Sequence, residues 1–531
     1  MKKFPFLRFA LSLPSALILI MACNALSAPP ASSTGALTCP HTSISSTSPN
    51  ATPEQPASTA ASVSETFLSS IDPSYFGETV IISTDGRHVA YVACQNSKFV
   101  AVIDGKVEGP YDAIGFSNGE DRPSFSPDGH HVAYAVTIQD KVSVVVDGMA
   151  AGPYDDVGKS IFFSPDSQRI AYVAKVGNKQ FAVINNKPGN VYDEVDNPHF
   201  SPDSQHVAYS VKKGTGWFVV VDGQEGKTYE DAYLVDSSFS PDSLHIAYRA
   251  LQGGKQLVVV DGKDGQPYEG IDVKSLIFSS NSQRVTYVVV QGGKQFVVVN
   301  GDEGKHYDGV TNPIFSPDGQ HVVYSAKNGT RQFAVVDGQE GMQYDGIASP
   351  IFSPDSQHMA YEAQQGGRQF VVMDGKEGKQ YDNIGSLIFS FDSIHTAYIA
   401  QQGGRQFVVV DGKEGNQYDS IASLIFSPDS LHIAYGAQQG DKKFVVLDGK
   451  EDKHYDNTII GNGTLQFSSD SQHLVYGALQ GGKEFVVLDE KEGRQYDLLG
   501  ANSIHFSLDS QGVTYIAVQG DKIYLVEEKI Q

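Results

Sequence analysis

The sequence predicts an all-β protein built from about twelve copies of one small antiparallel sheet. Three observations support this prediction. A Phe-Ser step recurs along the chain, most often 37 residues apart. Between these steps, apolar residues alternate with polar ones or form short unbroken runs, as in half-buried and fully buried strands. Turn residues separate the runs, and no segment carries a capped helical stripe of 3.6-residue period. A fixed period of this size is typical of stacked units that cannot bury their own faces alone.

One copy of the repeat, residues 351–387, shows how each strand is predicted; it reads IFSPDSQHMAYEAQQGGRQFVVMDGKEGKQYDNIGSL. Strand A ends at Phe-Ser, and the Ser-Pro-Asp-Ser turn leads to strand B around Ala-Tyr. A Gly-Gly turn leads to strand C at FVVM, and an Asp-Gly turn to strand D around Tyr-Asp. Four antiparallel strands in about 40 residues form the blade of a β-propeller. We expect the aromatic residues of strands A, B and C to pack between neighbouring blades.

The motif FSPDS followed five or six residues later by Ala-Tyr resembles the WD-repeat-like blade of the TolB propeller family, over residues 75–526. The copy at residues 351–387 departs from the strict WD repeat because it lacks the Gly-His and Trp-Asp dipeptides. The resemblance implies partners in a bacterial cell envelope.

The strand count suggests how the propeller closes. Strands A, B and C each occur twelve times, but the last unit ends before a strand D. An extra strand D stands at the front, around Tyr75, and we expect it to complete a blade whose other strands come from later in the chain. Because propellers typically have four to eight blades, two tandem six-bladed rings are slightly favoured over one oversized ring. In that arrangement Tyr75 closes the first ring and the strand at Tyr307 closes the second.

The N-terminal region predicts export. Residues 1–22 have a positively charged start and a short apolar run, as in a signal peptide. The following Cys23 fits a bacterial lipoprotein box and is the expected lipidation site; cleavage without lipidation and an uncleaved anchor remain alternatives. Residues 23–66 are rich in Ser, Thr, Ala and Pro and predict a disordered tether, and residues 67–531 form the propeller region.

The cysteine content and the net charge bear on disulfide formation and on nucleic-acid binding. Cys39 and Cys94 either form a disulfide or leave Cys94 as a small buried residue, and the second interpretation is favoured. The formal net charge of −23 argues against nucleic acid as a partner.

The repeated polar residues predict structural roles and no catalytic centre. A His follows the A–B turn in nine units, but equivalent atoms on adjacent packed sheets are about 10 Å apart, too far to share a metal ion. The Asp of each Ser-Pro-Asp-Ser motif is expected to accept hydrogen bonds from turn amides. No motif indicates a cofactor. A catalytic centre needs different groups converging on one point, whereas this chain repeats the same groups around an axis.

Partner binding is expected on the face that holds the B–C turns and D–A loops. The B–C turns carry a recurring cation, which would suit an anionic ligand or an acidic partner, and two D–A loops are longer than the others. The candidate contact residues are Arg368, Arg405 and Lys442 in the turns, and Asn118, Glu120, Asp121, Arg122 and Asn462 in the loops.

The sequence therefore favours a non-catalytic protein-interaction scaffold in the periplasm or on the cell surface, attached to a membrane only through its lipid. The alternative is a propeller enzyme, of hydrolase or lyase type, or a small-molecule binder with its site at the central channel. A pocket lined by polar residues that differ between blades, with shifted pKa values, would favour this alternative.

Overall fold

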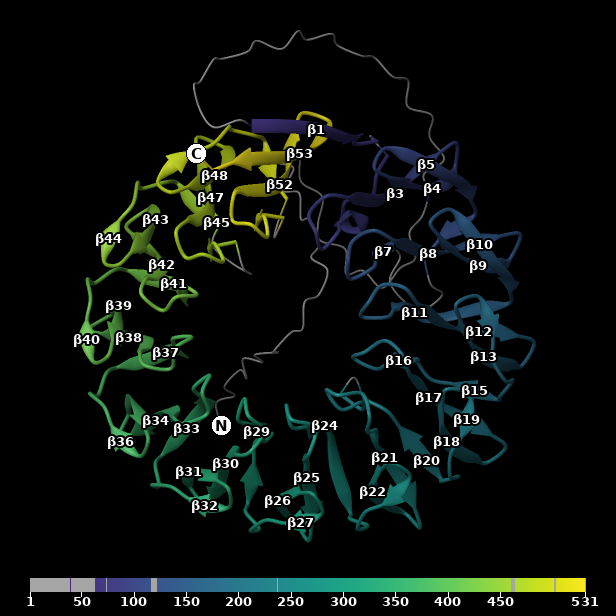
Figure 1. Ribbon diagram of the computed structural model, residues 1–531, viewed down its shortest axis with the longest axis horizontal. Helices are drawn as coiled ribbons and strands as arrows, with labels where there is room; N and C mark the ends of the chain where they lie inside the picture. Colours follow the sequence, from purple (N-terminus) through teal and green to yellow (C-terminus); the bar gives the residue numbers. More distant parts are fainter. Residues whose placement is uncertain are drawn as a thin grey trace, which may run out of the picture.

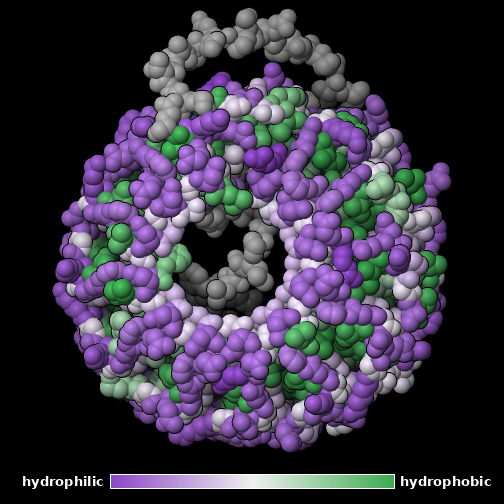
Figure 2. Space-filling model, viewed as in Figure 1, coloured by the Kyte–Doolittle hydropathy of each residue, from purple (hydrophilic) through white to green (hydrophobic). Residues whose placement is uncertain are grey.

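The computed structural model describes residues 39, 63–72, 74–115, 122–235, 237–459, 464–500 and 503–530. These residues form twelve small antiparallel sheets arranged in a single ring around a wide central opening (Figures 1 and 2). The all-β propeller prediction is confirmed. The only described helix is the 3₁₀ turn η1 (Gly77–Thr79).

We number the blades 1 to 12 in chain order and name their strands A to D from the central opening outward. Blades 1–4 comprise β2 (Ile81–Ile82), β3 (Val89–Gln95), β4 (Lys98–Ile103) and β5 (Lys106–Tyr111); β6 (Ala113–Ile114), β7 (Ser124–Phe125), β8 (Val132–Ile138), β9 (Lys141–Val146) and β10 (Met149–Tyr154); β11 (Asp156–Phe163), β12 (Ile170–Val176), β13 (Lys179–Ile184) and β14 (Lys187–Pro188); and β15 (Glu194–Val195), β16 (His199–Phe200), β17 (Val207–Lys213), β18 (Gly216–Val221) and β19 (Gln224–Glu225).

Blades 5–8 comprise β20 (Asp231–Tyr233), β21 (Ala247–Gln252), β22 (Lys255–Val260) and β23 (Lys263–Asp264); β24 (Gly270–Phe278), β25 (Val285–Gln291), β26 (Lys294–Val299) and β27 (Asp302–Glu303); β28 (Gly309–Val310), β29 (Ile314–Phe315), β30 (Val322–Asn328), β31 (Arg331–Val336) and β32 (Gln339–Glu340); and β33 (Gly346–Phe352), β34 (Met359–Gln365), β35 (Arg368–Met373) and β36 (Lys376–Glu377).

Blades 9–12 comprise β37 (Asn383–Phe389), β38 (Thr396–Gln402), β39 (Arg405–Val410) and β40 (Lys413–Glu414); β41 (Ser420–Phe426), β42 (Ile433–Gln439), β43 (Lys442–Leu447) and β44 (Lys450–Glu451); β45 (Asn457–Ile459), β46 (Gln466–Phe467), β47 (Leu474–Gln480), β48 (Lys483–Leu488) and β49 (Lys491–Glu492); and β50 (Leu498–Leu499), β51 (His505–Phe506), β52 (Gly512–Gln519) and β53 (Lys522–Lys529), with β1 (Val63–Ser70) as the outermost strand of blade 12.

Turn chemistry sets the hairpins within each blade. In blade 8, the C–D turn places Asp374 at φ 47° and Gly375 at φ 75°, the two positive values that a two-residue type I′ hairpin requires. Strand D is short: β36 is followed by a single bridge between Tyr381 and Gln369. The predicted order of four strands is therefore confirmed, with strand D reduced to two short contacts.

The core lies between blades. Tyr381, on strand D of blade 8, packs edge-on against Tyr398 and Phe407 of blade 9, with ring centroids 6.2 and 5.6 Å away. Its hydroxyl donates a hydrogen bond of 3.0 Å to Glu414 of blade 9. The strand D tyrosine thus links consecutive blades through both apolar packing and a charge-assisted hydrogen bond. The expected role of strand A is only partly met, because Phe352 is half-buried whereas Tyr381 is 1 % exposed.

The preference for two rings is wrong. Val288 of blade 6 packs in one cluster with Tyr324 of blade 7, as at other junctions, and Tyr307 bridges Gln295 within blade 6. Blade 12 instead packs on blade 1, where Ile516 and Tyr91 share a core cluster. Blade 6 therefore packs on blade 7, and the ring closes between blades 12 and 1.

An N-terminal strand closes the ring, but it is not the predicted one. β1 pairs antiparallel with β53 and supplies strand D of blade 12, whereas Tyr75 bridges Ala93 within blade 1. β1 begins at Val63, inside the expected tether. The repeat position of the strand D tyrosine holds Ser69 here, paired with Ile523, so the motif that marks this strand elsewhere is missing.

The preference for an unpaired Cys94 is also wrong, because Cys39 forms a disulfide with Cys94 of blade 1.

Glu65 of β1 should be required to keep the ring closed. It accepts hydrogen bonds from the Tyr496 hydroxyl at 2.6 Å and from Arg494 at 2.7 Å, both in blade 11. Glu414 makes the same two kinds of contact between blades 8 and 9. We expect Glu65→Ala and Glu414→Ala each to lower the free energy of unfolding by about 1–3 kcal/mol in chemical denaturation.

Only Glu65→Ala should speed hydrogen exchange in β1 and β53, because β1 joins blade 12 without a hairpin connection. Equal protection of these strands in both variants would contradict a closing role for Glu65.

Candidate functional site

The two faces of the ring differ in their side chains. His358 in the A–B turn of blade 8 contacts Asp374 in the C–D turn, with Nδ1 2.8 Å from Oδ2, so both turns lie on one face, the A–B face. Arg368 in the B–C turn is paired with Asp382 in the D–A loop, which places both on the opposite B–C face.

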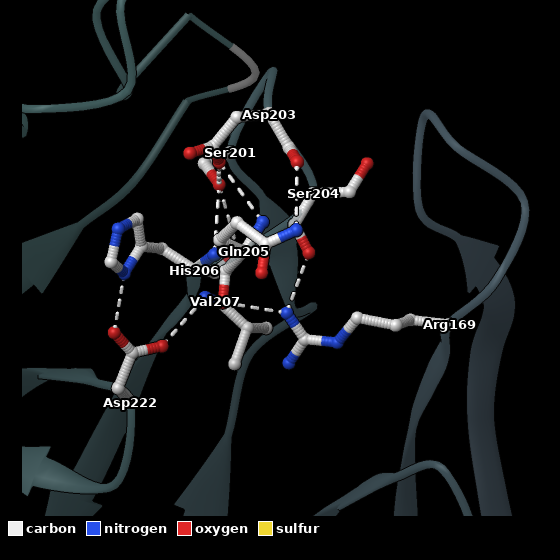
Figure 3. A network of polar contacts seen from close by, with 8 residues as sticks. All are labelled: Arg169, Ser201, Asp203, Ser204, Gln205, His206, Val207 and Asp222. Carbon is white, nitrogen blue, oxygen red and sulfur yellow. Dashed lines mark hydrogen bonds and ion pairs between the residues drawn. The ribbon is translucent and has the colours of Figure 1, made fainter.

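The repeated residues of the A–B face lock the turns, as Figure 3 shows for blade 4. The Asp203 carboxylate accepts hydrogen bonds from the Ser201 hydroxyl and the Gln205 amide. His206 lies 2.7 Å from Asp222, whose other oxygen accepts from the Val207 amide. The same His–Asp contact of 2.7–2.8 Å recurs at His88, His131, His245, His321, His358, His395, His432 and His473. These geometries fit the structural roles expected for both residue types.

The B–C face cations predicted as partner contacts have internal counter-charges. Arg368, Arg405 and Lys442 are ion-paired with the Asp that begins the following D–A loop, namely Asp382, Asp419 and Asp456. Each of these Asp residues also accepts a hydrogen bond from a glycine amide of the next blade, so the pair fastens neighbouring blades. Exposed ion pairs contribute only about 0–1 kcal/mol each.

The remaining predicted contacts are scattered. Arg122 is half-buried just before β7. β7 lies across the central opening from β34, β39 and β43, the strands that carry or adjoin the other three cations (Figure 1). Asn118, Glu120, Asp121 and Asn462 lie outside the described residues, as does Cys23. The described members of the predicted set therefore form no single site.

A cavity of about 1000 Å³ lies along the inner strands of blades 3–6. Its wall includes Val157, Asp196, Ser210, Leu234 and Val273, which come from four blades. Strand A is interrupted here: β15 and β16 leave residues 196–198 between them, and β20 has only three residues. In blades 8–10 strand A runs unbroken for seven residues. We refer to this feature as the inner-wall cavity.

The polar groups of the inner-wall cavity differ from blade to blade. Ser210 is 1 % exposed, and its hydroxyl makes no hydrogen bond with any described residue. The pKa of Asp196 is raised, first because the surrounding protein desolvates its carboxylate and then because of the negative charges of Asp231 and Glu194. The side chain is nevertheless open to the cavity. Lys159, Lys175 and Lys274 also line it. The cavity can therefore accept a ligand that carries both charge signs and an apolar part.

A second feature is apolar and lies on the A–B face. Phe391, Ile394 and Leu431 are 62 %, 70 % and 74 % exposed and occupy the A–B turns of blades 9 and 10. These turns touch, because the Asp392 amide donates a 2.9 Å hydrogen bond to Ser430. We call these three residues the turn patch.

The sequence analysis missed the turn patch. The signal was available: Gln occupies the repeat position of Ile394 and Leu431 in most other units, for example Gln357.

A third feature that was not predicted is Glu362 on strand B of blade 8. It stands where other blades carry Val, Ala, Ile, Ser or Gly, or Arg249 in blade 5, and no described residue forms a hydrogen bond with it. Burial raises its pKa to about 7.

The fold assigns the protein to the β-propellers, as a ring of twelve blades. No protein-family model matches the sequence, and no curated protein matches it. Within the described residues, we find no helix with the length and hydrophobicity to cross a bilayer.

Solved structures with a similar fold include the Dos1 propeller, at 13 % identity over 56 % of this chain and 93 % of that one, with a TM-score of 0.28. TolB from Acinetobacter baumannii is 12 % identical over 54 % of this chain and 79 % of its own, with a TM-score of 0.23. An oligogalacturonate lyase in complex with manganese is 8 % identical over 64 % of this chain and 98 % of its own, with a TM-score of 0.26. These similarities concern the propeller fold alone.

Glu362 should make stability depend on pH. Its pKa in the folded state is about 7, above the value of about 4.3 in an unfolded chain. The folded state therefore binds the proton more tightly, and stability is full below about pH 4 and falls as the pH rises through 7. We expect Glu362→Gln to stabilise the protein by about 1–3 kcal/mol at pH 8, with little effect at pH 4.5.

Urea unfolding at both pH values measures this difference. Glu362→Ile, which copies Ile399 of blade 9, should behave like Glu362→Gln. A constant difference between wild type and variant across this range would contradict the assigned pKa.

Proposed function

We propose that the protein is a non-catalytic protein-interaction scaffold of a bacterial cell envelope. The turn patch carries this proposal. Large exposed apolar side chains on adjacent turns are characteristic of protein-binding surfaces, and aromatic residues dominate the binding energy of such surfaces. Polar Gln is the usual residue at two of the three positions, and the face of the ring drawn in Figure 2 is largely hydrophilic.

The cellular location belongs to the same proposal. Residues 1–22 direct export, and Cys23 carries the lipid that attaches the protein to a membrane, in the periplasm or on the cell surface. The disulfide between Cys39 and Cys94 supports an oxidising compartment, because such bonds persist mainly outside the cytosol.

Substitution of the turn patch tests the proposal. The variant Phe391→Ser, Ile394→Gln, Leu431→Gln introduces residues that stand at these positions in other blades, such as Ser280 and Gln357. We expect it to fold normally and to lose at least tenfold in the recovery of partner proteins cross-linked in intact envelopes and counted by mass spectrometry.

Leu244→Gln is the matched control, because Leu244 is 74 % exposed in the same kind of turn but lies in blade 5. Unchanged recovery with the triple variant would refute binding at the turn patch. Cys23→Ser separately tests attachment: it should release the protein from the membrane fraction without changing partner recovery by the purified chain.

The inner-wall cavity supports a second candidate function, the binding of a small molecule, or a reaction on one, at the central opening. The specific observation is the buried, unpaired Ser210 hydroxyl beside Asp196, whose pKa is raised. A buried polar atom without a partner costs about 1–3 kcal/mol, which a ligand that bonds to it can recover.

This candidate function predicts that Ser210→Val weakens stabilisation of the protein by ligands. The substitution introduces valine, which is the residue at the equivalent position of blade 3, Val173. Charged and zwitterionic compounds that raise the melting temperature of the wild type should do so at least tenfold less effectively with this variant. Ser325→Val is the matched control, because Ser325 has the same strand position and an unpaired hydroxyl but does not line the cavity. Equal stabilisation of both variants would reject a ligand site at Ser210.

A further inference from the structure

Three potential metal ligands converge between blades 1 and 2 on the A–B face. Asp85 and His88 lie on the β2–β3 turn and His130 on the β7–β8 turn, and each offers one ligand atom within 4.8 Å of the other two. The two imidazole rings are edge-on, with centroids 6.2 Å apart. We propose that these residues bind a divalent transition-metal ion, Zn²⁺, with two imidazole nitrogens and one carboxylate oxygen.

The orientation of His88 suits metal binding. Its Nδ1 lies 2.7 Å from Asp104 Oδ2, which leaves Nε2 as the free ligand atom. Asp104 is itself fixed, because its other oxygen accepts a 2.9 Å hydrogen bond from the Val89 amide. A carboxylate on the second ring nitrogen is the usual partner of a metal-bound histidine, since it fixes the tautomer and makes the ligand nitrogen more basic.

Gly129 provides the space for Asp85. A Cβ at position 129 would lie 2.6 Å from Asp85 Oδ1. In the next turn the same position holds Ser167, whose hydroxyl accepts a hydrogen bond from the Asp128 amide at 3.0 Å. The glycine therefore replaces a serine that would occupy the space of the carboxylate.

His130 distinguishes this site from the other described turns. Other blades carry Arg, Gln, Leu or Ile at its position, for example Arg87 in blade 1 and Gln168 in blade 3. Histidines at equivalent positions, such as His88 and His131, lie too far apart to share an ion. His130 is one residue earlier and belongs to a different position of the turn.

The surrounding charges also favour a cation. The guanidinium of Arg87 is 3.3 Å from Glu527 of blade 12, so its positive charge is paired away from the three ligands. Asp128 accepts a hydrogen bond from the His130 amide and adds a negative charge nearby. Three N and O ligands with an open fourth position form a set that Zn²⁺ binds with a water molecule completing the tetrahedron.

Titration of the full chain, free of any affinity tag, with zinc chloride tests the proposal. We expect one equivalent to bind by calorimetry, and Co²⁺ to give the visible absorption of a tetrahedral site. His130→Gln should weaken binding at least tenfold, and Asp104→Asn should weaken it about 10–100-fold as a positioning residue. The control His206→Gln should bind as the wild type does.

Absence of binding by the wild type, or equal affinity of His130→Gln, would overturn the assignment. Melting curves in EDTA establish that each variant is folded, and Gln at this turn position is already tolerated in other blades.

A transplanted site provides a second test. The double variant Ser167→Gly, Gln168→His rebuilds the Gly-His pair beside Asp128 and His131, between blades 2 and 3. We expect its stoichiometry to rise from one to two equivalents. A stoichiometry that remains at one would contradict the conclusion that this turn geometry creates the site.

Discussion

The contact on which the ring depends is the strand D tyrosine that reaches into the next blade. Its ring packs on a strand B tyrosine or a strand C phenylalanine of that blade, and in many blades on both. At several junctions its hydroxyl also bonds to an acidic residue of the neighbour, as Tyr344 does with Glu377 at 3.0 Å. Each blade is too small to bury both faces alone, so its stability resides in this junction. Because one contact is repeated with nearly identical geometry, the angle between blades is also repeated, and the chain curves steadily until blade 12 meets blade 1.

The sequence predicted what every unit shares. The strand order, the hairpin turns and the packing of aromatic residues of strands B and C between blades follow from local chemistry that recurs in each repeat. The ring count depends instead on the small rotation between neighbouring blades, which no single repeat encodes. The closing strand was misplaced for a related reason: Ser69 occupies the tyrosine position of β1, so this strand lacks the feature that identifies the others.

The candidate sites were harder to predict because they arise where units differ. The cations chosen from the sequence are repeated, and the repeat also supplies their counter-ions, as Asp382 does for Arg368. The inner-wall cavity is lined by residues that differ between blades at equivalent positions, such as Val173 and Ser210. The turn patch arises from Phe391, Ile394 and Leu431, which replace the residues usual at these turn positions. In a repeat protein, a departure from the consensus is therefore a better guide to a site than the consensus itself.

Among the described residues, only the junction between blades 12 and 1 lacks the strand D tyrosine. With Ser69 in place of the tyrosine, the Tyr91 hydroxyl of blade 1 donates instead to the Ser70 carbonyl at 2.8 Å. Other interactions gather around blade 1: the ion pair between Arg87 and Glu527 and the disulfide to Cys94. The proposed zinc ligands extend this set to the junction with blade 2. Bringing blade 12 onto blade 1 closes a loop of the whole chain and costs more conformational entropy than packing two consecutive blades. Cross-links beside this junction reduce that cost because they restrict the conformations of the chain before the ring closes.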